Sequence, residues 1–363
     1  MKNKNWILNG ISNYTLLLLI FLLTCLKISI FILIKSEFFK VGLGGSDADY
    51  YHAYAIGYID NAVNIWPIIL NNLYNLGLYD RVGISIFLFF LSLIVIPFFI
   101  AKLADLSFKH NQKFFLYILL LCVAYPTLFY YTLDVYRDVF MVFSFLVGCL
   151  IVKKSLNNSN FFYFCFLYLL AIILGLFLLS LRPYLGYAFL LALFLWKIKF
   201  TKKRIIFLSV VYFLTLFIAN YIGLLSTLTE YRSGFEEGGG GSTLGLNFSN
   251  PIMFFPNFIL STLGQLFGLY ITNPFAIVLL LFETLPFVFM LVYVIKNIKL
   301  ADNFIRFLII FFVLYASVWL IGNDNLGTAV RLRMYNYLAI YICFFYILRL
   351  RHLSSILPQD LKK

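Results

Sequence analysis

Long apolar runs recur along the whole chain and are separated by short polar segments. A helix that crosses a bilayer needs about 20 predominantly apolar residues. Runs that reach or approach this length cover residues 14–34, 84–101, 114–133, 139–152, 161–180, 183–196, 205–225, 275–295, 304–321 and 334–348. The pattern predicts an all-α, polytopic integral membrane protein with about ten transmembrane helices. We expect residues 1–363 to form a single transmembrane domain.

The apolar stretch 251–272 is ambiguous because prolines and glycines interrupt it. If it does not cross the membrane, most lysines and arginines fall on one side and most carboxylates on the other, as the positive-inside rule requires. This choice predicts that both termini are cytoplasmic and that two long outer loops cover 36–83 and 226–273. We expect an interfacial helix in each loop, at 60–79 and at 251–272. The glycine-containing segment 226–250 is predicted to be flexible and open to water.

The amino-terminal run resembles a signal peptide, because Lys2 and Lys4 precede it. It is long enough to span and lacks a small-residue cleavage site, so we expect a retained signal anchor.

Composition agrees with a membrane protein. The chain of 363 residues is 63% hydrophobic and only 12% charged, whereas soluble domains carry about 25% charged residues. The net charge of +13 is scattered between apolar runs, which argues against nucleic acid as a partner. The five cysteines lie in apolar runs without metal-ligand spacing. No nucleotide-binding or metalloprotease motif is present, and no convincing internal repeat favours an inverted-repeat transporter.

Four polar clusters are predicted to share the outer face. The first, at 44–52, contains Asp47, Asp49, Tyr50 and His52. In an extended backbone both carboxylates would point to one side, whereas a helix would splay them. Paired in this way they would provide a general base or hold a divalent cation. The alternative is that the segment only caps the beginning of a helix.

The second cluster contains Asp134, Arg137 and Asp138, and the third contains Arg182 and Tyr184. On a helix Asp134 and Asp138 would face one way and would orient a sugar or an anionic leaving group. The alternative is a surface turn that neutralises itself. Arg182 is able to clamp a phosphate with two parallel hydrogen bonds, or to anchor the helix end at lipid headgroups.

The fourth cluster contains Arg331 and Arg333, which precede the last apolar run on the predicted outer side, against the positive-inside trend. An anionic ligand would explain that placement, and anionic headgroups are the alternative. Glu283 lies inside an apolar run, where it would serve a substrate pathway, a proton relay or helix packing.

Short motifs in this order resemble two families of membrane enzymes. The segment 44–55 (GGSDADYYHAYA) and the segment 126–145 are similar to the first outer loop and to a helix–helix turn of C-type membrane glycosyltransferases. Arg182 with Pro183, together with Arg331 and Arg333, resembles the arginines of O-antigen (Wzy-type) polysaccharide polymerases. The resemblance implies a bacterial inner-membrane enzyme with a periplasmic active site.

What the resemblance implies is a glycosyltransferase or polymerase that uses a polyprenyl-(di)phosphate-linked sugar or oligosaccharide in cell-surface polysaccharide synthesis. Asp47 or Asp49 would be the base, and Arg182, Arg331 and Arg333 would bind the lipid diphosphate. We expect no cofactor besides a possible divalent cation, with a flippase and chain-length regulators as candidate partners. A single-sugar transferase and a non-enzymatic flippase for lipid-linked glycans are the alternatives.

Overall fold

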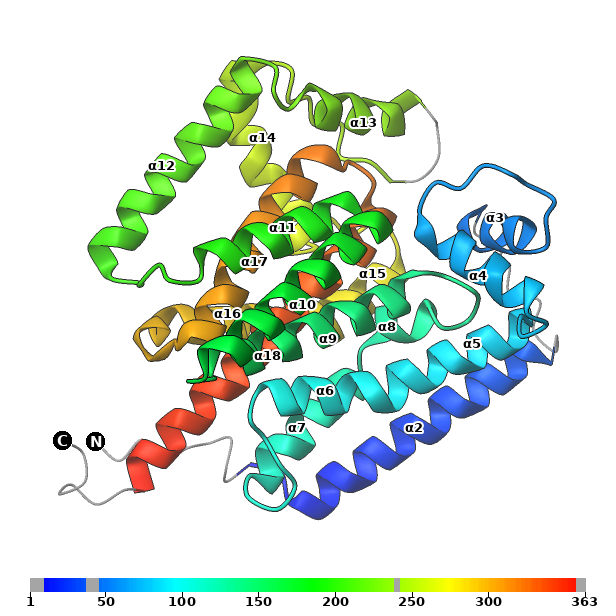
Figure 1. Cartoon of the computed structure of the whole chain (residues 1–363), viewed down its shortest axis with the longest axis horizontal. Helices are drawn as coiled ribbons and strands as arrows, with labels where there is room; N and C mark the ends of the chain where they lie inside the picture. The colour runs from blue at the N-terminus through cyan, green and yellow to red at the C-terminus, as the bar shows by residue number, and fades with distance from the viewer. Residues whose placement is uncertain (1–9, 37–45, 238–241, 357–363) are drawn as a thin grey trace. The chain divides into compact units, whose positions relative to one another are not determined.

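The computed structural model describes residues 10–36, 46–237 and 242–356, and these form helices without any β-sheet (Figure 1). The chain divides into two compact units. Unit 1 comprises residues 1–186 and 345–363, and unit 2 comprises residues 187–344. Within the described residues, eight helices are long and apolar enough to cross a membrane. The all-helical character predicted from the sequence is therefore confirmed, and the eight helices are consistent with a polytopic membrane protein.

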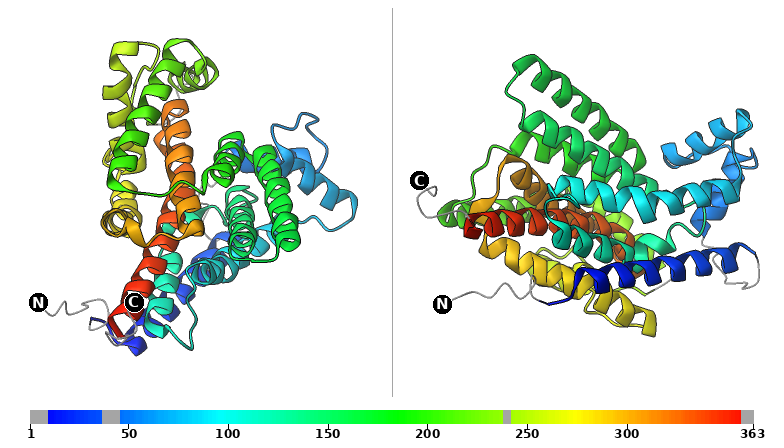
Figure 2. Two further views of the ribbon diagram at one scale, coloured as in Figure 1. Left: turned by 60° about the vertical axis from the view of Figure 1, so that its left-hand side comes forward. Right: turned by 90° about the horizontal axis from the view of Figure 1, so that it is seen from below.

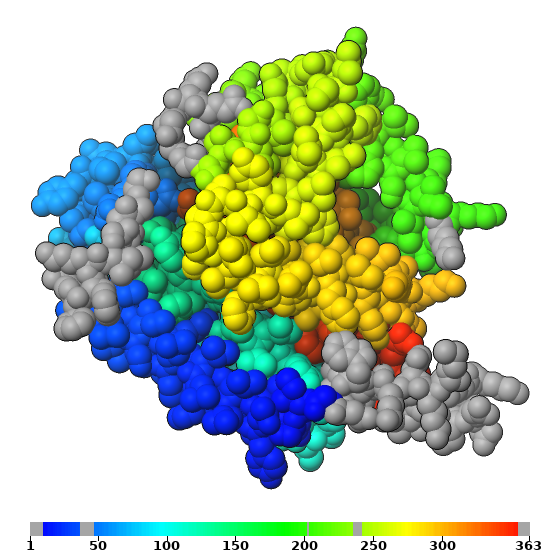
Figure 3. All heavy atoms as spheres, turned by 180° about the vertical axis from the view of Figure 1, so that it is seen from behind, coloured from blue at the N-terminus to red at the C-terminus, as the bar shows by residue number. Residues whose placement is uncertain are grey.

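Unit 1 is built on long apolar helices joined by shorter ones. In chain order they are α2 (Asn13–Lys35), α3 (Ser46–Ala55), α4 (Ile65–Asn75), α5 (Arg81–Phe90), the π-helical turn η1 (Leu91–Val95), α6 (Ile96–Leu103), α7 (Gln112–Val123), α8 (Pro126–Tyr130), α9 (Asp138–Leu156) and α10 (Phe161–Leu181), with the start of α11 (Pro183–Leu195) and the end of α18 (Leu326–Ile356). Helix α9 packs against α6 and α10, and α2 packs against α7. Most side chains of α2 are not covered by the rest of the protein, and Figure 3 shows this helix as dark blue spheres on the surface. A bilayer would cover such an apolar surface.

Helix ends in unit 1 follow from particular residues. Asp80 caps α5 by accepting a hydrogen bond from the backbone N–H of Gly83 (2.7 Å). Pro126 opens α8 and has no N–H, so the apolar run predicted at 114–133 is broken into α7 and α8. Arg182 has extended backbone dihedrals between α10 and α11, and Pro183 starts α11.

Helices α10 and α11 approach each other closely at Gly186. A Cβ atom at this position would lie 2.3 Å from the Cα of Leu179. Only glycine permits this approach, so the turn at Arg182 depends on it.

Unit 2 contains the rest of α11, α12 (Lys202–Tyr221), α13 (Ser226–Glu237), the 3₁₀ turn η2 (Pro251–Met253), α14 (Phe254–Ser261), the π-helical turn η3 (Thr262–Leu266), α15 (Pro274–Leu279), the π-helical turn η4 (Leu280–Thr284), α16 (Leu285–Lys296), the 3₁₀ turn η5 (Ile298–Leu300), α17 (Asn303–Gly322) and the first part of α18. Helix α17 is largely buried and packs against α13 and α14, whereas no residue of 203–221 in α12 is fully buried. Phe213 and Phe217 of α12 contact Phe258 and Phe254 of α14, so the two helices lie side by side (Figure 2).

Each predicted apolar run contains a helix, but three details differ from the expectation. The runs at 114–133 and 183–196 yield helices shorter than the spanning length. Residues 226–237, expected to be part of a flexible segment, form α13, whereas Gly238–Gly241 lie outside the described residues. The expected interfacial helix at 60–79 is α4, but its Trp66 is buried against Phe140 and donates to the carbonyl of Val135 (2.9 Å). Trp66 therefore packs inside the protein, although tryptophan at this position suggested a membrane interface.

Candidate functional site

The first polar cluster folds as a helix. Helix α3 begins at Ser46 and carries Asp47 and Asp49 in its first turn. The two carboxylates therefore splay apart, and the extended arrangement that would pair them is not observed. Asp47 is half-buried, and the Asp49 side chain is 56% exposed. The glycines that precede α3 lie outside the described residues.

Arg81 joins the first and second clusters. Its guanidinium binds both oxygens of Asp134, at 2.8 Å through Nε and 2.6 Å through a terminal nitrogen. That terminal nitrogen also lies 2.7 Å from a carboxylate oxygen of Asp49. A guanidinium fork matches the planar carboxylate, so the bidentate pair fixes the orientation of Asp134. Arg81 thus ties α3, the start of α5 and the turn before α9 to one another.

Asp134 is held in its charged form. Burial by itself raises the pKa of this carboxyl, but hydrogen bonds from Arg81 and from the backbone N–H of Val135 (2.8 Å) outweigh that effect. The pKa of Asp134 is therefore below its ordinary value. The predicted helix that would align Asp134 with Asp138 does not form, because α9 begins only at Asp138.

Asp138 and Arg182 form a buried pair at the ends of α9 and α10. Their side chains are 1% and 7% exposed, and the closest charged atoms are 3.7 Å apart. Within the described part of the chain, neither carboxylate oxygen of Asp138 has a hydrogen-bond partner. Arg137, next in the chain, donates to the carbonyl of Leu181 (2.9 Å). A buried carboxylate without a donor is costly, and a ligand or water that donates to it would remove that cost.

Tyr51 of α3 lies near Arg137 and Asp138, whereas His52 of α3 and Tyr79 lie near Arg81 and Asp134. Tyr51 is buried, and burial raises the pKa of its hydroxyl, against the nearby positive charge of Arg137. His52 shares a hydrogen bond with the hydroxyl of Tyr79 (2.8 Å), and burial together with the positive charge of Arg81 lowers the pKa of His52. Burial raises the pKa of Tyr79 to about 12. Both hydroxyls therefore stay protonated at neutral pH.

Two further predicted residues lie near helix starts. The Tyr50 hydroxyl hydrogen-bonds the carbonyl of Asn61 and accepts from the N–H of Val63 (3.1 Å), so it already orders the connection to α4. Tyr184 lies half-buried in the first turn of α11.

The structure thus brings three of the four predicted clusters together in unit 1. We refer to Asp49, Arg81, Asp134, Asp138 and Arg182 as the unit 1 cluster. Arg81, Tyr51 and Tyr79 were not predicted as site residues. Arg81 follows Asp80 immediately before an apolar run on the predicted outer side, the same pattern that singled out Arg331, and that pattern would have identified it.

The fourth cluster lies in unit 2 and is largely internal. Arg333 is buried on α18 and lies 3.3 Å from a carboxylate oxygen of Glu283, which is fully buried in η4. Arg331, two residues earlier, is half-buried. Asp324, at the start of the same motif, binds Arg232 of α13 in a second buried ion pair. The region of the two predicted arginines therefore contains buried ion pairs, and Arg333 does not face an open surface.

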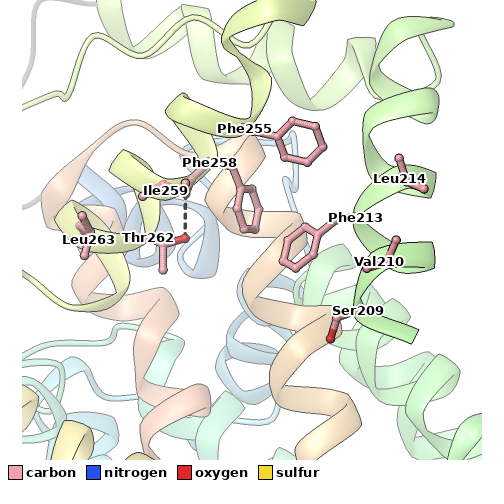
Figure 4. A pocket seen from close by; sticks show the side chains of 9 residues that line it. All are labelled: Ser209, Val210, Phe213, Leu214, Phe255, Phe258, Ile259, Thr262 and Leu263. Atoms are coloured by element: carbon pink, nitrogen blue, oxygen red, sulfur yellow. Dashed lines mark hydrogen bonds between the residues drawn. The ribbon is translucent and has the colours of Figure 1, made fainter. Parts of the chain in front are cut away.

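Unit 2 also has an apolar groove between α12 and the segment formed by α14 and η3 (Figure 4). Its volume is about 560 Å³, and Phe213, Phe255 and Phe258 line it. The one hydrogen bond drawn there, from Thr262 to the carbonyl of Phe258 (2.7 Å), satisfies the hydroxyl within its own helix. A groove with this lining suits hydrocarbon rather than a sugar or a phosphate.

The described residues contain no group of three or more His, Cys, Asp or Glu side chains that could hold a metal ion. Comparison of the chain with protein families, with curated proteins and with solved structures found no match.

Proposed function

We propose that the chain is a bacterial inner-membrane glycosyltransferase, spanning the bilayer about ten times with both termini in the cytoplasm. It acts at the outer face on a polyprenyl-diphosphate-linked sugar or oligosaccharide during cell-surface polysaccharide synthesis, and the unit 1 cluster is its active site. The observation that carries the proposal is the buried Asp138 carboxylate, which lies 3.7 Å from Arg182 and lacks a hydrogen-bond donor among the described residues.

The charges of this region suit a ligand that has both hydroxyls and phosphates. Asp138 would accept a hydrogen bond from a sugar hydroxyl, which would satisfy the buried carboxylate. Arg182 and Arg137 would bind the diphosphate and stabilise the negative charge that develops on it as the bond to the sugar breaks. We assign the diphosphate to Arg182 and Arg137 because they belong to the same unit as Asp49 and Asp138, whereas Arg333 belongs to unit 2.

Asp49 is the group we propose as the base. It is the most exposed carboxylate of the cluster, and Arg81 contacts only one of its oxygens. The other oxygen would take the proton of the acceptor hydroxyl while that hydroxyl oxygen bonds to the sugar carbon and the diphosphate leaves with the bonding electrons. Arg81 would hold Asp49 at a fixed distance from Asp134, and positioning of this kind supplies much of an enzyme's rate.

The test is deletion of the gene followed by electrophoresis of the envelope polysaccharide. Wild type and the variants Asp49→Asn, Asp138→Asn and Asp60→Asn are expressed in the deletion strain. Asp60 is exposed on the same predicted outer loop and lies outside the cluster, so it serves as the matched control. We expect the control to restore the polysaccharide and the two cluster variants to leave it truncated.

The pattern of truncation separates two reactions. One repeat unit on the lipid anchor indicates a polymerase, and a repeat unit that lacks one sugar indicates a single-sugar transferase. Normal chains in the deletion strain would refute the proposal, as would full restoration by Asp49→Asn and Asp138→Asn at normal protein levels.

A second candidate function is transport of a lipid-linked glycan without bond formation. The observation that favours it is the buried Glu283–Arg333 pair, because charged side chains within helices of spanning length mark transport pathways. π-Helical turns such as η4, which carries Glu283, are also frequent at functional sites. Complete repeat units that accumulate on the cytoplasmic leaflet of the deletion strain would support transport instead of transfer.

A further inference from the structure

A cavity of about 570 Å³ lies in unit 2, between two connections that are about 100 residues apart in the sequence. Lys199 and Thr201 line it from the connection before α12, and Lys299 lines it from η5. Arg306 lines it from the first turn of α17. The volume falls within the usual range for small-molecule sites.

We propose that this cavity is an anion site for a phosphate-bearing ligand. Three cationic side chains converge on it, and the described lining residues include no carboxylate. Like charges that face one cavity repel each other, so an anion bound between them removes that repulsion. This site is independent of the unit 1 cluster and of the proposed reaction.

Asp302 follows the lining residue Ala301 but does not itself line the cavity, and its negative charge offsets part of the positive charge there. Its carboxylate accepts a hydrogen bond from the backbone N–H of Ile305 (2.8 Å) as the N-cap of α17. Arg306 donates to the carbonyl of Asp302 (3.2 Å) and to the side chain of Asn303, which fixes its guanidinium in the first turn. A positioned guanidinium beside two lysines is a phosphate-binding combination.

The positive-inside rule alone explains why these connections carry basic residues. It does not explain why basic residues of two distant connections face the same cavity. Lys203 and Lys296 lie in the same two regions, are exposed, and do not line the cavity. Substitution of Lys203 and Lys296 therefore distinguishes binding in the cavity from binding to basic residues in general.

The phosphate has two plausible sources, which share one chemistry. Phe200 and Ile298 also line the cavity, so an anionic lipid headgroup would find apolar contacts beside the charges. A soluble phosphate compound would use the charges alone. Dioctanoyl phosphatidylglycerol and inorganic pyrophosphate are the probes for these two sources, and dioctanoyl phosphatidylcholine is the zwitterionic reference.

The experiment uses the full chain in neutral detergent at low salt, because salt screens exposed charges. Binding of each probe is measured from the rise in melting temperature with probe concentration. The variant Lys199→Gln/Lys299→Gln removes two exposed charges of the cavity, and Lys203→Gln/Lys296→Gln is the matched control. Since each basic residue near an anionic surface contributes roughly fivefold to affinity, we expect roughly 25-fold weaker binding in the first variant.

Each outcome decides the matter. Binding of either probe that the cavity variant loses and the control keeps supports the site, and the probe that binds identifies the source. The proposal is overturned if neither anionic probe stabilises the wild type, or if both double variants lose the same affinity. Melting without probe checks that each variant is folded. The polysaccharide assay on the unit 1 variants is separate, so the two proposals fail independently.

Discussion

The buried pair of Arg232 and Asp324 allows the sharpest test of the structure. Arg232 lies on α13 and donates to the carbonyls of Leu246 (2.8 Å), Leu320 (3.0 Å) and Asn323 (2.6 Å) in addition to binding Asp324. The side chains of the pair are 3% and 0% exposed. One guanidinium therefore satisfies carbonyls at the end of α17 and holds the segment that follows Gly241. We predict that Arg232→Met releases α13 from α17.

The size of the effect follows from burial. Removal of one partner from a buried ion pair costs about 3–5 kcal/mol, because the remaining charge stays desolvated. Asp324 would keep hydrogen bonds from the backbone N–H groups of Leu244 (3.1 Å) and Gly245 (2.9 Å), so we expect the lower end of that range, about 3 kcal/mol. At about 1.4 kcal/mol per factor of ten, the open population rises roughly 100-fold.

The assay is amide hydrogen exchange of α13 in detergent-solubilised protein, with thermal melting as a second readout. Glu230→Gln is the control, because Glu230 is exposed on the same helix and its loss should change stability by less than about 0.5 kcal/mol. A double-mutant cycle with Asp324→Asn should give a favourable coupling energy of about 2 kcal/mol.

The reasoning is refuted by two results. Exchange of α13 that is unchanged in Arg232→Met would show that the side chain does not hold the helix. A coupling energy near zero would show that the charges of Arg232 and Asp324 act independently of each other.

Three further predictions concern unit 1. Gly186→Ala should destabilise the protein by about 1–3 kcal/mol, measured by melting, because the added methyl overlaps α10; Gly234→Ala, with open space around it, should not. Lys153→Met should reduce the free energy of unfolding by about 2 kcal/mol or more, since the buried ammonium binds two carbonyls and a carboxylate. Lys154→Met is the control and should be near neutral, because Lys154 is exposed. Equal losses of stability in the two variants would contradict the role assigned to Lys153. The folded-state pKa of His52 is lowered, so its contribution to stability is present above about pH 6.5 and falls as the pH drops below that value. Melting against pH should show this loss in the wild type and less of it in His52→Gln.

The sequence was sufficient for the class of the protein and for most helix positions. Apolar runs separated by polar segments produce helices in lipid, because every backbone polar group must be satisfied internally. Proline rules also apply locally, and they account for the break at Pro126 and the start of α11 at Pro183. The number of runs that cross the membrane and their orientation stay predictions.

The candidate site was only partly predictable. Polar residues on the predicted outer side pointed to Asp49, Asp134, Asp138 and Arg182 because charge is rare in this chain. Their partners depend on packing between segments far apart in the sequence. Arg81 binds Asp134, which lies 53 residues away, and no local periodicity encodes that contact.

The sequence by itself therefore determined which segments form helices long enough to span a membrane and which charged residues lie at the helix ends. Tertiary structure decided what each charge does. It buries Asp138 beside Arg182, makes α3 a helix that separates Asp47 from Asp49, and pairs Arg333 with Glu283. The physical reason is that hydrophobicity and helix breaking act through neighbours along the chain. Burial and ion pairing act through neighbours in space, and those arise only once the helices have packed.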